Sequence, residues 1–153
     1  MQAALRADGI DGWLLYDFRG LNPLASDVTG VGRQGGHLAT RRWYYLIPAS
    51  GEPRGLVHAI ERHSLAHLPG RPTQYAGRDQ LEAGLRALLA GMRRIAMEYS
   101  PGCAIPYVAR VDAGTIELVR QIRSRGGLFR RSHPAFLDHL GRAGTGDAPS
   151  GVR

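Results

Sequence analysis

The chain has 153 residues, 43% of them apolar, which is enough for one moderate core and too little for two large domains. Its formal charge is +7, and all 20 of its basic residues are arginine. The charge is uneven, because residues 1–122 carry 14 arginines against 11 acidic residues, whereas residues 123–153 carry 6 against 2. The body shows no basic stripe interleaved with stacking aromatic residues, so nucleic acid is not expected as a partner.

The cysteine content and the amino-terminal residues indicate the cellular compartment in which the protein is expected. Cys103 is the single cysteine, which excludes a disulfide within the chain and makes the reducing cytoplasm the simplest expectation. Arg6 and Asp8 interrupt the amino terminus before a long apolar run develops. Neither a signal peptide nor a membrane span is therefore predicted.

The first part of the chain predicts strands with one long connection between them. Residues 19–37 are rich in Gly, Pro and Asn and too long for an ordinary connection, so they predict either a functional loop or a short helix near 23–26. The other elements expected here are a helix at 1–7, a buried strand at 12–18, and a β-hairpin formed by 41–49 and 54–60.

The second part predicts two amphipathic helices around a short strand. Asp79 and Glu82 have the spacing of a capping box, and a helical face follows them, formed by Leu81, Leu85, Leu88, Leu89 and Met92. A second helix starts at 112–115 and buries Ile116, Val119 and Ile122. Between and before them we expect a turn or two of helix at 61–68, a weak strand at 73–76 and a strand at 95–99. The alternation predicts an α/β fold of three layers, a mixed β-sheet flanked by helices.

Several apparent catalytic or metal motifs lack their context. Gly30, Gly32 and Gly35 spell G-x-G-x-x-G, but loop-like residues precede them and a strand follows, the reverse of a dinucleotide fingerprint. His63 and His67 have the spacing of zinc ligands, with His58 nearby, yet no further ligands accompany them, so solvated histidines are favoured and no metal site is predicted. Ser64 and Ser100 lack a nucleophile elbow, and Cys103 lacks an adjacent base, so no catalytic residue is predicted.

Three segments carry a resemblance: DGWLLYDFRGLNPLA, TRRWYYLIPASGEPRGLVHAIE and, most specifically, MEYSPGCAIPYVARVDAGTIELVR. From about Gln2 to Ile122 the chain resembles the amino-terminal domain of the creatinase, prolidase and aminopeptidase P family of pita-bread metallopeptidases, and in particular its bacterial Xaa-Pro peptidase-like members. The resemblance implies a creatinase-type amino-terminal domain at 1–122. In the family, a catalytic domain of more than 200 residues follows and binds two divalent metals, commonly manganese, cobalt or zinc.

Only 31 residues follow Ile122, so this chain is expected to lack the catalytic domain, to bind no metal of its own and to be inactive alone. Gly126, Gly127 and Pro134 interrupt the pattern where the family continues with a strand, which a truncation or frameshift would explain. The alternative is a short native helix at 128–140 that caps a solitary domain. Residues 141–153 are expected to be disordered in either case.

The resemblance also implies a role. In the family, this domain mediates subunit association and lends side chains to the rim of a partner's active site, so self-association or a homologous subunit is expected, with a proline-containing peptide as ligand of the assembled enzyme. The rim candidates are Asp17, Arg19, Asn22, Arg42 and Trp43. Alternatively, Trp43 and Tyr45 are core residues on one strand face and Arg42 a solvated neighbour.

Two functions remain open at this point. The first is a non-catalytic assembly and substrate-gating domain of a Xaa-Pro aminopeptidase or prolidase-like enzyme. The second is a free-standing interaction module of the same fold, which binds peptide or a full-length homologue.

Overall fold

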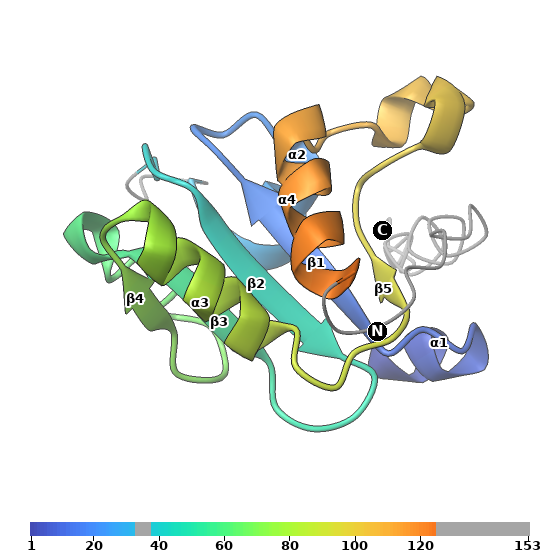
Figure 1. Cartoon of the computed structure of the whole chain (residues 1–153), viewed down its shortest axis with the longest axis horizontal. Helices are drawn as coiled ribbons and strands as arrows, with labels where there is room; N and C mark the ends of the chain where they lie inside the picture. Colours follow the sequence, from blue (N-terminus) through green and yellow to red (C-terminus); the bar gives the residue numbers. More distant parts are fainter. Residues whose placement is uncertain (33–37, 125–153) are drawn as a thin grey trace, which may run out of the picture.

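A mixed β-sheet forms the centre of the computed structural model, which describes residues 1–32 and 38–124 (Figure 1). The strand order within the described residues is β4-β3-β2-β1-β5, with β1–β2 and β2–β3 antiparallel and with β1–β5 and β3–β4 parallel. The strands are β1 (Gly12–Asp17), β2 (Trp43–Pro48), β3 (Arg54–His58), β4 (Thr73–Tyr75) and β5 (Ile95–Ala96).

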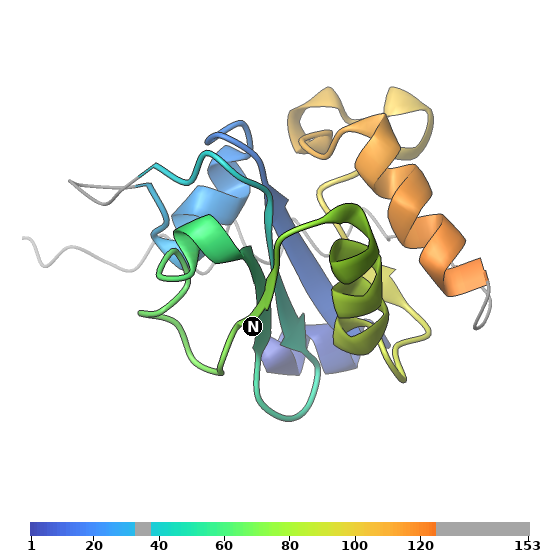
Figure 2. The same ribbon diagram turned by 60° about the vertical axis from the view of Figure 1, so that its left-hand side comes forward.

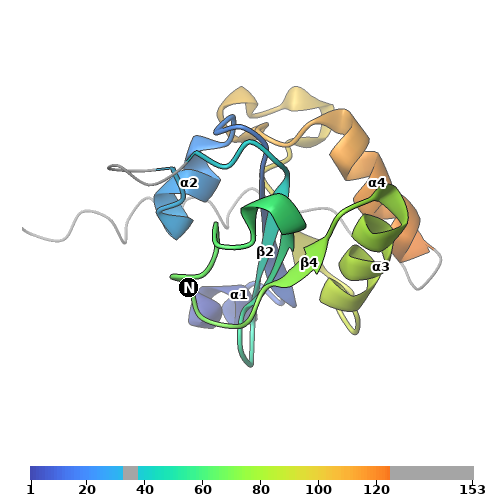
Figure 3. The same cartoon turned by 90° about the vertical axis from the view of Figure 1, so that its left-hand side faces the viewer.

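Helices cover both faces of this sheet, as the edge-on view in Figure 3 shows. The α-helices are α1 (Gln2–Ala7), α2 (Pro23–Thr29), α3 (Arg78–Leu88) and α4 (Ala113–Ser124). Short 3₁₀ turns are η1 (Ala59–Glu61), η2 (Pro101–Cys103) and η3 (Pro106–Val108). Helices α1 and α2 lie on one side and α3 and α4 on the other. The predicted three-layer α/β fold is confirmed.

Alternation along the strands divides the core into two clusters. On β1, Leu14 and Tyr16 point to the α3/α4 face, whereas Trp13 and Leu15 point to the α1/α2 face. Strand β2 repeats the pattern, so all six residues of each strand are buried. A strand covered on both faces reads as a continuous apolar run, which is why GWLLYD and WYYLIP are so rich in large side chains.

Several expected elements differ in extent. The short helix considered near 23–26 is α2. It begins at Pro23 because Asn22 caps it, and it runs to Thr29, where Gly30 in a left-handed conformation ends it. Strand pairing of 95–99 stops at Ala96, although Met97 and Glu98 stay buried. Helix α4 extends two residues beyond Ile122. Most of the tail predicted from 123 onward lies outside the described residues.

The capping box predicted at Asp79 is wrong. Helix α3 begins at Arg78, two residues earlier than an N-cap at Asp79 would place it, and its N-cap is Gly77, which offers no side-chain acceptor. Glu82 instead lies on the outer surface between Arg78 and Arg86. The helix also ends at Leu88, so Met92 reaches the core from the following turn.

Hydropathy along the helices is low. Within the described ranges, none of the helices has the length and apolar character that crossing a bilayer would need.

Candidate functional site

A pocket of about 460 Å³ opens where β1 ends and α4 begins. Its lining combines two arginines, two aspartates and an apolar side, and consists of Tyr16, Asp17, Phe18, Leu21, Arg42, Arg110, Asp112 and Thr115. In Figure 2 the loop that holds η2 and η3 lies at the same end of the molecule as the turn after β1. Segments from three parts of the sequence therefore meet at this pocket.

The turn after β1 is built around Asp17, whose side chain is 2% exposed. One carboxylate oxygen accepts from the Gly20 N–H at 2.9 Å and the other from the Asn22 N–H at 2.8 Å. Arg19 and Gly20, between them, both have positive φ, of 60° and 74°. An arginine seldom adopts this conformation, so the Asp17 carboxylate stabilises a turn that would otherwise be strained.

Asn22 joins this turn to the helix and to a buried carboxyl group. Its Oδ1 accepts from the Ala25 N–H at 3.2 Å, which caps α2. Its Nδ2 donates to the Tyr16 carbonyl at 2.7 Å and to Glu98 Oε2 at 2.8 Å. With 1% of its surface exposed, Asn22 positions the turn from below.

Glu98 is fully buried under the pocket. Its Oε1 accepts from the Trp13 indole N–H and its Oε2 from Asn22. Burial raises the pKa of Glu98 to about 7, although the hydrogen bonds from Asn22 and Trp13 act in the opposite direction. Both named donors are neutral, so the carboxyl group is held by hydrogen bonds without a compensating charge from them.

Asp112 forms the opposite wall and caps α4. Its Oδ1 accepts from the Thr115 N–H, and its Oδ2 from the Thr115 and Tyr16 hydroxyls, all at 2.8 Å. Burial acts to raise the pKa of Asp112, but these hydrogen bonds outweigh it and the pKa lies below its ordinary value. Asp112 thus stays a carboxylate near neutral pH and ties β1 to α4.

Arg42 and Arg110 supply positive charge to the pocket. Arg42 is mostly buried, and its charge acts to lower the pKa of Tyr16, which burial raises well above the ordinary value. Arg110 is exposed and donates from Nε to the Tyr107 carbonyl at 3.0 Å. With Phe18 and Leu21 beside two arginines and two aspartates, the pocket suits a ligand or partner that has both charged and apolar groups.

The structure brings together only part of the expected rim. Asp17 and Arg42 line the pocket, and Arg19 is exposed in the adjoining turn. Asn22 lies beneath it, and Trp43 is 1% exposed in the α1/α2 core with Tyr45, as the alternative interpretation of that strand expects. Whether any of these side chains contacts a substrate stays a prediction.

Sequence reasoning assigned no role to Glu98, Tyr16 or Arg110. Glu98 is 76 residues from Asn22 and 85 from Trp13, so no local spacing signals their contact. A glutamate inside an otherwise apolar run was the one available hint. Asp112 was identified as a helix start but not as a pocket wall.

The histidines of the apparent zinc spacing have separate partners. His67 contacts the Thr29 carbonyl at 2.7 Å, His63 accepts from Arg62 at 3.0 Å, and His58 accepts from the Ile60 N–H at 3.2 Å. Across residues 1–32 and 38–124, no three His, Cys, Asp or Glu side chains are grouped as metal ligands. Gly30 ends α2 in a left-handed conformation, so a helix precedes the glycine motif, and Gly35 lies outside the described residues.

Comparison with known proteins gives matches by structure. No family model matches the sequence, and a search of curated proteins finds no relative. A prolidase from Pyrococcus horikoshii OT3 aligns over 90% of this chain with a TM-score of 0.56 and 16% identity, and the chain spans only 33% of that protein.

Two shorter structures align over nearly their whole length. A proline dipeptidase structure from Streptococcus agalactiae 2603V gives a TM-score of 0.59 and 10% identity, and covers 90% of this chain and 92% of its own. The N-terminal domain of a Xaa-Pro dipeptidase from Lactobacillus brevis gives a TM-score of 0.58 and 12% identity, and the alignment covers 90% of this chain and 95% of that domain. The chain therefore has the fold of a creatinase-type amino-terminal domain, like the one in these prolidases and Xaa-Pro dipeptidases, and the resemblance stated from the sequence is confirmed at the level of fold.

Proposed function

We propose that this chain is the assembly and substrate-gating domain of a Xaa-Pro peptidase-like metallopeptidase. The observation that supports this is the alignment over 95% of an isolated Xaa-Pro dipeptidase amino-terminal domain. The domain associates with a second subunit and offers part of a peptide-binding rim. Its own residues carry out no hydrolysis.

The pocket at the end of β1 is the region that would serve this role. Leu21 is 67% exposed and Phe18 37% exposed, beside Arg42 and Asp17. Exposed apolar side chains next to fixed charges are typical of contact surfaces, where the apolar area gives affinity and the charges give orientation. Asp17 and Asn22 would act by positioning the turn, and Arg19 by reaching the partner from it.

The divalent metals that the family uses do not fit the residues described here. The pocket offers two aspartates, and both carboxylates already accept hydrogen bonds from the protein. Metal binding and the hydrolytic step would therefore belong to a separate catalytic domain.

The first experiment measures association by sedimentation velocity over a range of protein concentrations. The wild-type chain should dimerise or join a full-length Xaa-Pro dipeptidase, and Leu21→Asp should weaken this association at least about tenfold, because it places a charge in the apolar contact. Ile60→Asp is the matched control, since Ile60 is 74% exposed but lies on η1 outside the pocket.

If the chain stays monomeric and does not bind the full-length homologue, the assembly role is contradicted. Binding of proline-containing peptides by such a monomer would favour the alternative, a free-standing interaction module. Turnover of a Xaa-Pro dipeptide by the purified chain with manganese would overturn both. Translation of the source DNA beyond codon 120 in three frames tests whether a shortened or frameshifted gene accounts for the sequence.

A further inference from the structure

A second cavity, of about 220 Å³, lies between the start of β2, the end of β4 and the start of α3. Arg41, Arg42 and Arg78 line it, together with His58 and the Tyr75 ring. The lining that the structure describes contains no aspartate or glutamate. Three basic residues border this small volume, and the acidic side chains nearby lie outside its lining, so the cavity favours an anion.

Arg42 is the half-buried arginine of this set. It forms no ion pair with any residue in the described part of the chain. Its backbone carbonyl accepts from the Tyr75 hydroxyl at 2.6 Å, and its charge acts to lower the pKa of Tyr75, which burial raises. A neutral hydroxyl beside the guanidinium does not compensate a charge removed from water.

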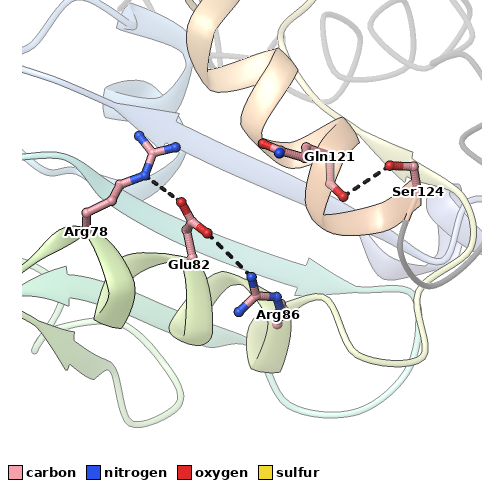
Figure 4. Close-up of polar contacts among 5 residues, drawn as sticks. All are labelled: Arg78, Glu82, Arg86, Gln121 and Ser124. Atoms are coloured by element: carbon pink, nitrogen blue, oxygen red, sulfur yellow. Dashed lines mark hydrogen bonds and ion pairs between the residues drawn. The ribbon is translucent and has the colours of Figure 1, made fainter.

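Carboxylates adjoin these arginines from outside the cavity lining. Asp17 and Asp112 share the first pocket with Arg42, and two glutamates lie beside Arg41 and Arg78. Glu61 accepts from the Thr40 N–H, the Thr40 hydroxyl and the Arg41 N–H, at 2.9, 2.5 and 3.0 Å. Glu82 contacts Arg78 at 2.6 Å and Arg86 at 3.4 Å along the outer surface of α3 (Figure 4). Neither glutamate belongs to the cavity lining.

We propose that this cavity binds a phosphate group, either as the free ion or carried on a small organic molecule. Planar guanidinium groups match phosphate oxygens with paired hydrogen bonds, and Arg42, which has no ion pair in the described residues, supplies the main positive charge for the ligand. A phosphate presents oxygens toward several walls at once, whereas a carboxylate presents only two. This site is separate from the pocket at the end of β1, although Arg42 contributes to the wall of both.

Titration of the purified chain with inorganic phosphate tests the proposal, with binding followed by calorimetry at constant ionic strength. Glycerol 3-phosphate and acetate are titrated in parallel. Phosphate should bind saturably and acetate at least about tenfold more weakly. Tighter binding of glycerol 3-phosphate would identify an organic phosphate as the ligand, and equal binding the free ion.

Substitutions of single arginines test where on the chain phosphate binds. Arg42→Gln should weaken phosphate binding about tenfold or more, since a hydrogen bond to a charged group typically contributes that much. Arg93→Gln is the matched control, with the same loss of charge at an exposed position beyond the other end of α3, and should bind like wild type. If Arg42→Gln fails to fold, Arg78→Gln replaces it, because the Arg78 side chain is 60% exposed.

Absence of saturable binding would overturn the proposal. Equal weakening in Arg42→Gln and Arg93→Gln would do the same, because it would show general attraction to a basic protein. Equal affinity for acetate and phosphate would also contradict it.

Discussion

The two faces of the sheet are held by different kinds of interaction. The α3/α4 face is filled mainly by aliphatic side chains such as Leu85, Leu88 and Ile116. The α1/α2 face includes Trp13, whose indole donates to the buried Glu98, and Glu98 in turn accepts from the residue that caps α2. The first face depends mainly on apolar burial, with one hydrogen-bonded link from Tyr16 to Asp112 at its edge, and the second also depends on a fully buried hydrogen-bond network centred on Glu98.

The candidate site is positioned by the second kind of interaction. Apolar packing is tolerant of small changes in shape, whereas a buried network fixes its members through specific donors and acceptors. The turn from Asp17 to Asn22 is attached to the second kind of interaction. The pocket at the end of β1 is therefore most sensitive to polar substitutions beneath it.

The largest effect is expected on the apolar face. Leu85 is fully buried, so Leu85→Ala should lower the free energy of unfolding by about 3–4 kcal/mol through lost burial and a residual cavity. Leu85→Met, which keeps the volume, should cost about 1 kcal/mol. Urea denaturation followed by circular dichroism measures both, and equal losses in the two variants would contradict cavity formation as the cause.

The next effect is a pH dependence that arises on the network face. The pKa of Glu98 in the folded chain is about 7, above its ordinary 4.5, so the folded state holds this proton more tightly than the unfolded state. Its contribution is complete below about pH 4.5 and is lost as the pH rises to about 7. The loss is on the order of 3 kcal/mol, since the pKa differs by about 2.5 between the two states and one pKa unit corresponds to about 1.4 kcal/mol.

Chemical denaturation at several pH values between 4.5 and 8 measures this dependence. Glu98→Gln does not titrate, so its free energy of unfolding should change less with pH than that of the wild type. The difference between the two slopes isolates Glu98 from the histidines. Parallel slopes in the two proteins would show that Glu98 keeps the same pKa folded and unfolded.

The smallest effect compares the caps of α3 and α4. Asp112→Ala removes the acceptor for the Thr115 N–H and should destabilise the chain by about 1 kcal/mol. Asp79→Ala should change stability by about 0.5 kcal/mol or less, because Asp79 lies in the first turn of α3 and not at its N-cap. Thermal melts of the two variants distinguish them, and a larger loss for Asp79→Ala would reinstate the capping box.

Prediction from sequence succeeded where the hydrophobic periodicity of a single segment determines its secondary structure. The apolar runs around Trp13 and Tyr44 specified buried strands, and Leu81, Leu85 and Leu88 specified the inner face of α3. It failed at the ends of helices and strands, where a capping residue or a partner strand sets the boundary. Asp79 and Gly77 both precede the apolar face of α3, and only the observed start of the helix shows which one caps it.

The candidate site was predictable only as a region. DFRGLNP stood out as a loop after a strand, and Asp17 and Arg42 do line the pocket. The inward orientation of Asn22 and the burial of Trp43 depend on which face of the sheet each residue meets. Periodicity along one segment carries no information about a neighbour 76 residues away, such as Glu98 for Asn22.

The class of fold, the strands with their large side chains and the amphipathic helices could be predicted from the residues alone, because these features follow from local periodicity and turn residues. Tertiary structure alone decided which charges share a cavity. Arg42 and Arg78 are 36 residues apart in sequence, and they line one cavity because β3 and β4, which lie between them, pair in parallel and lead into α3 beside the start of β2. Electrostatics acts through space, and only the folded chain sets those distances.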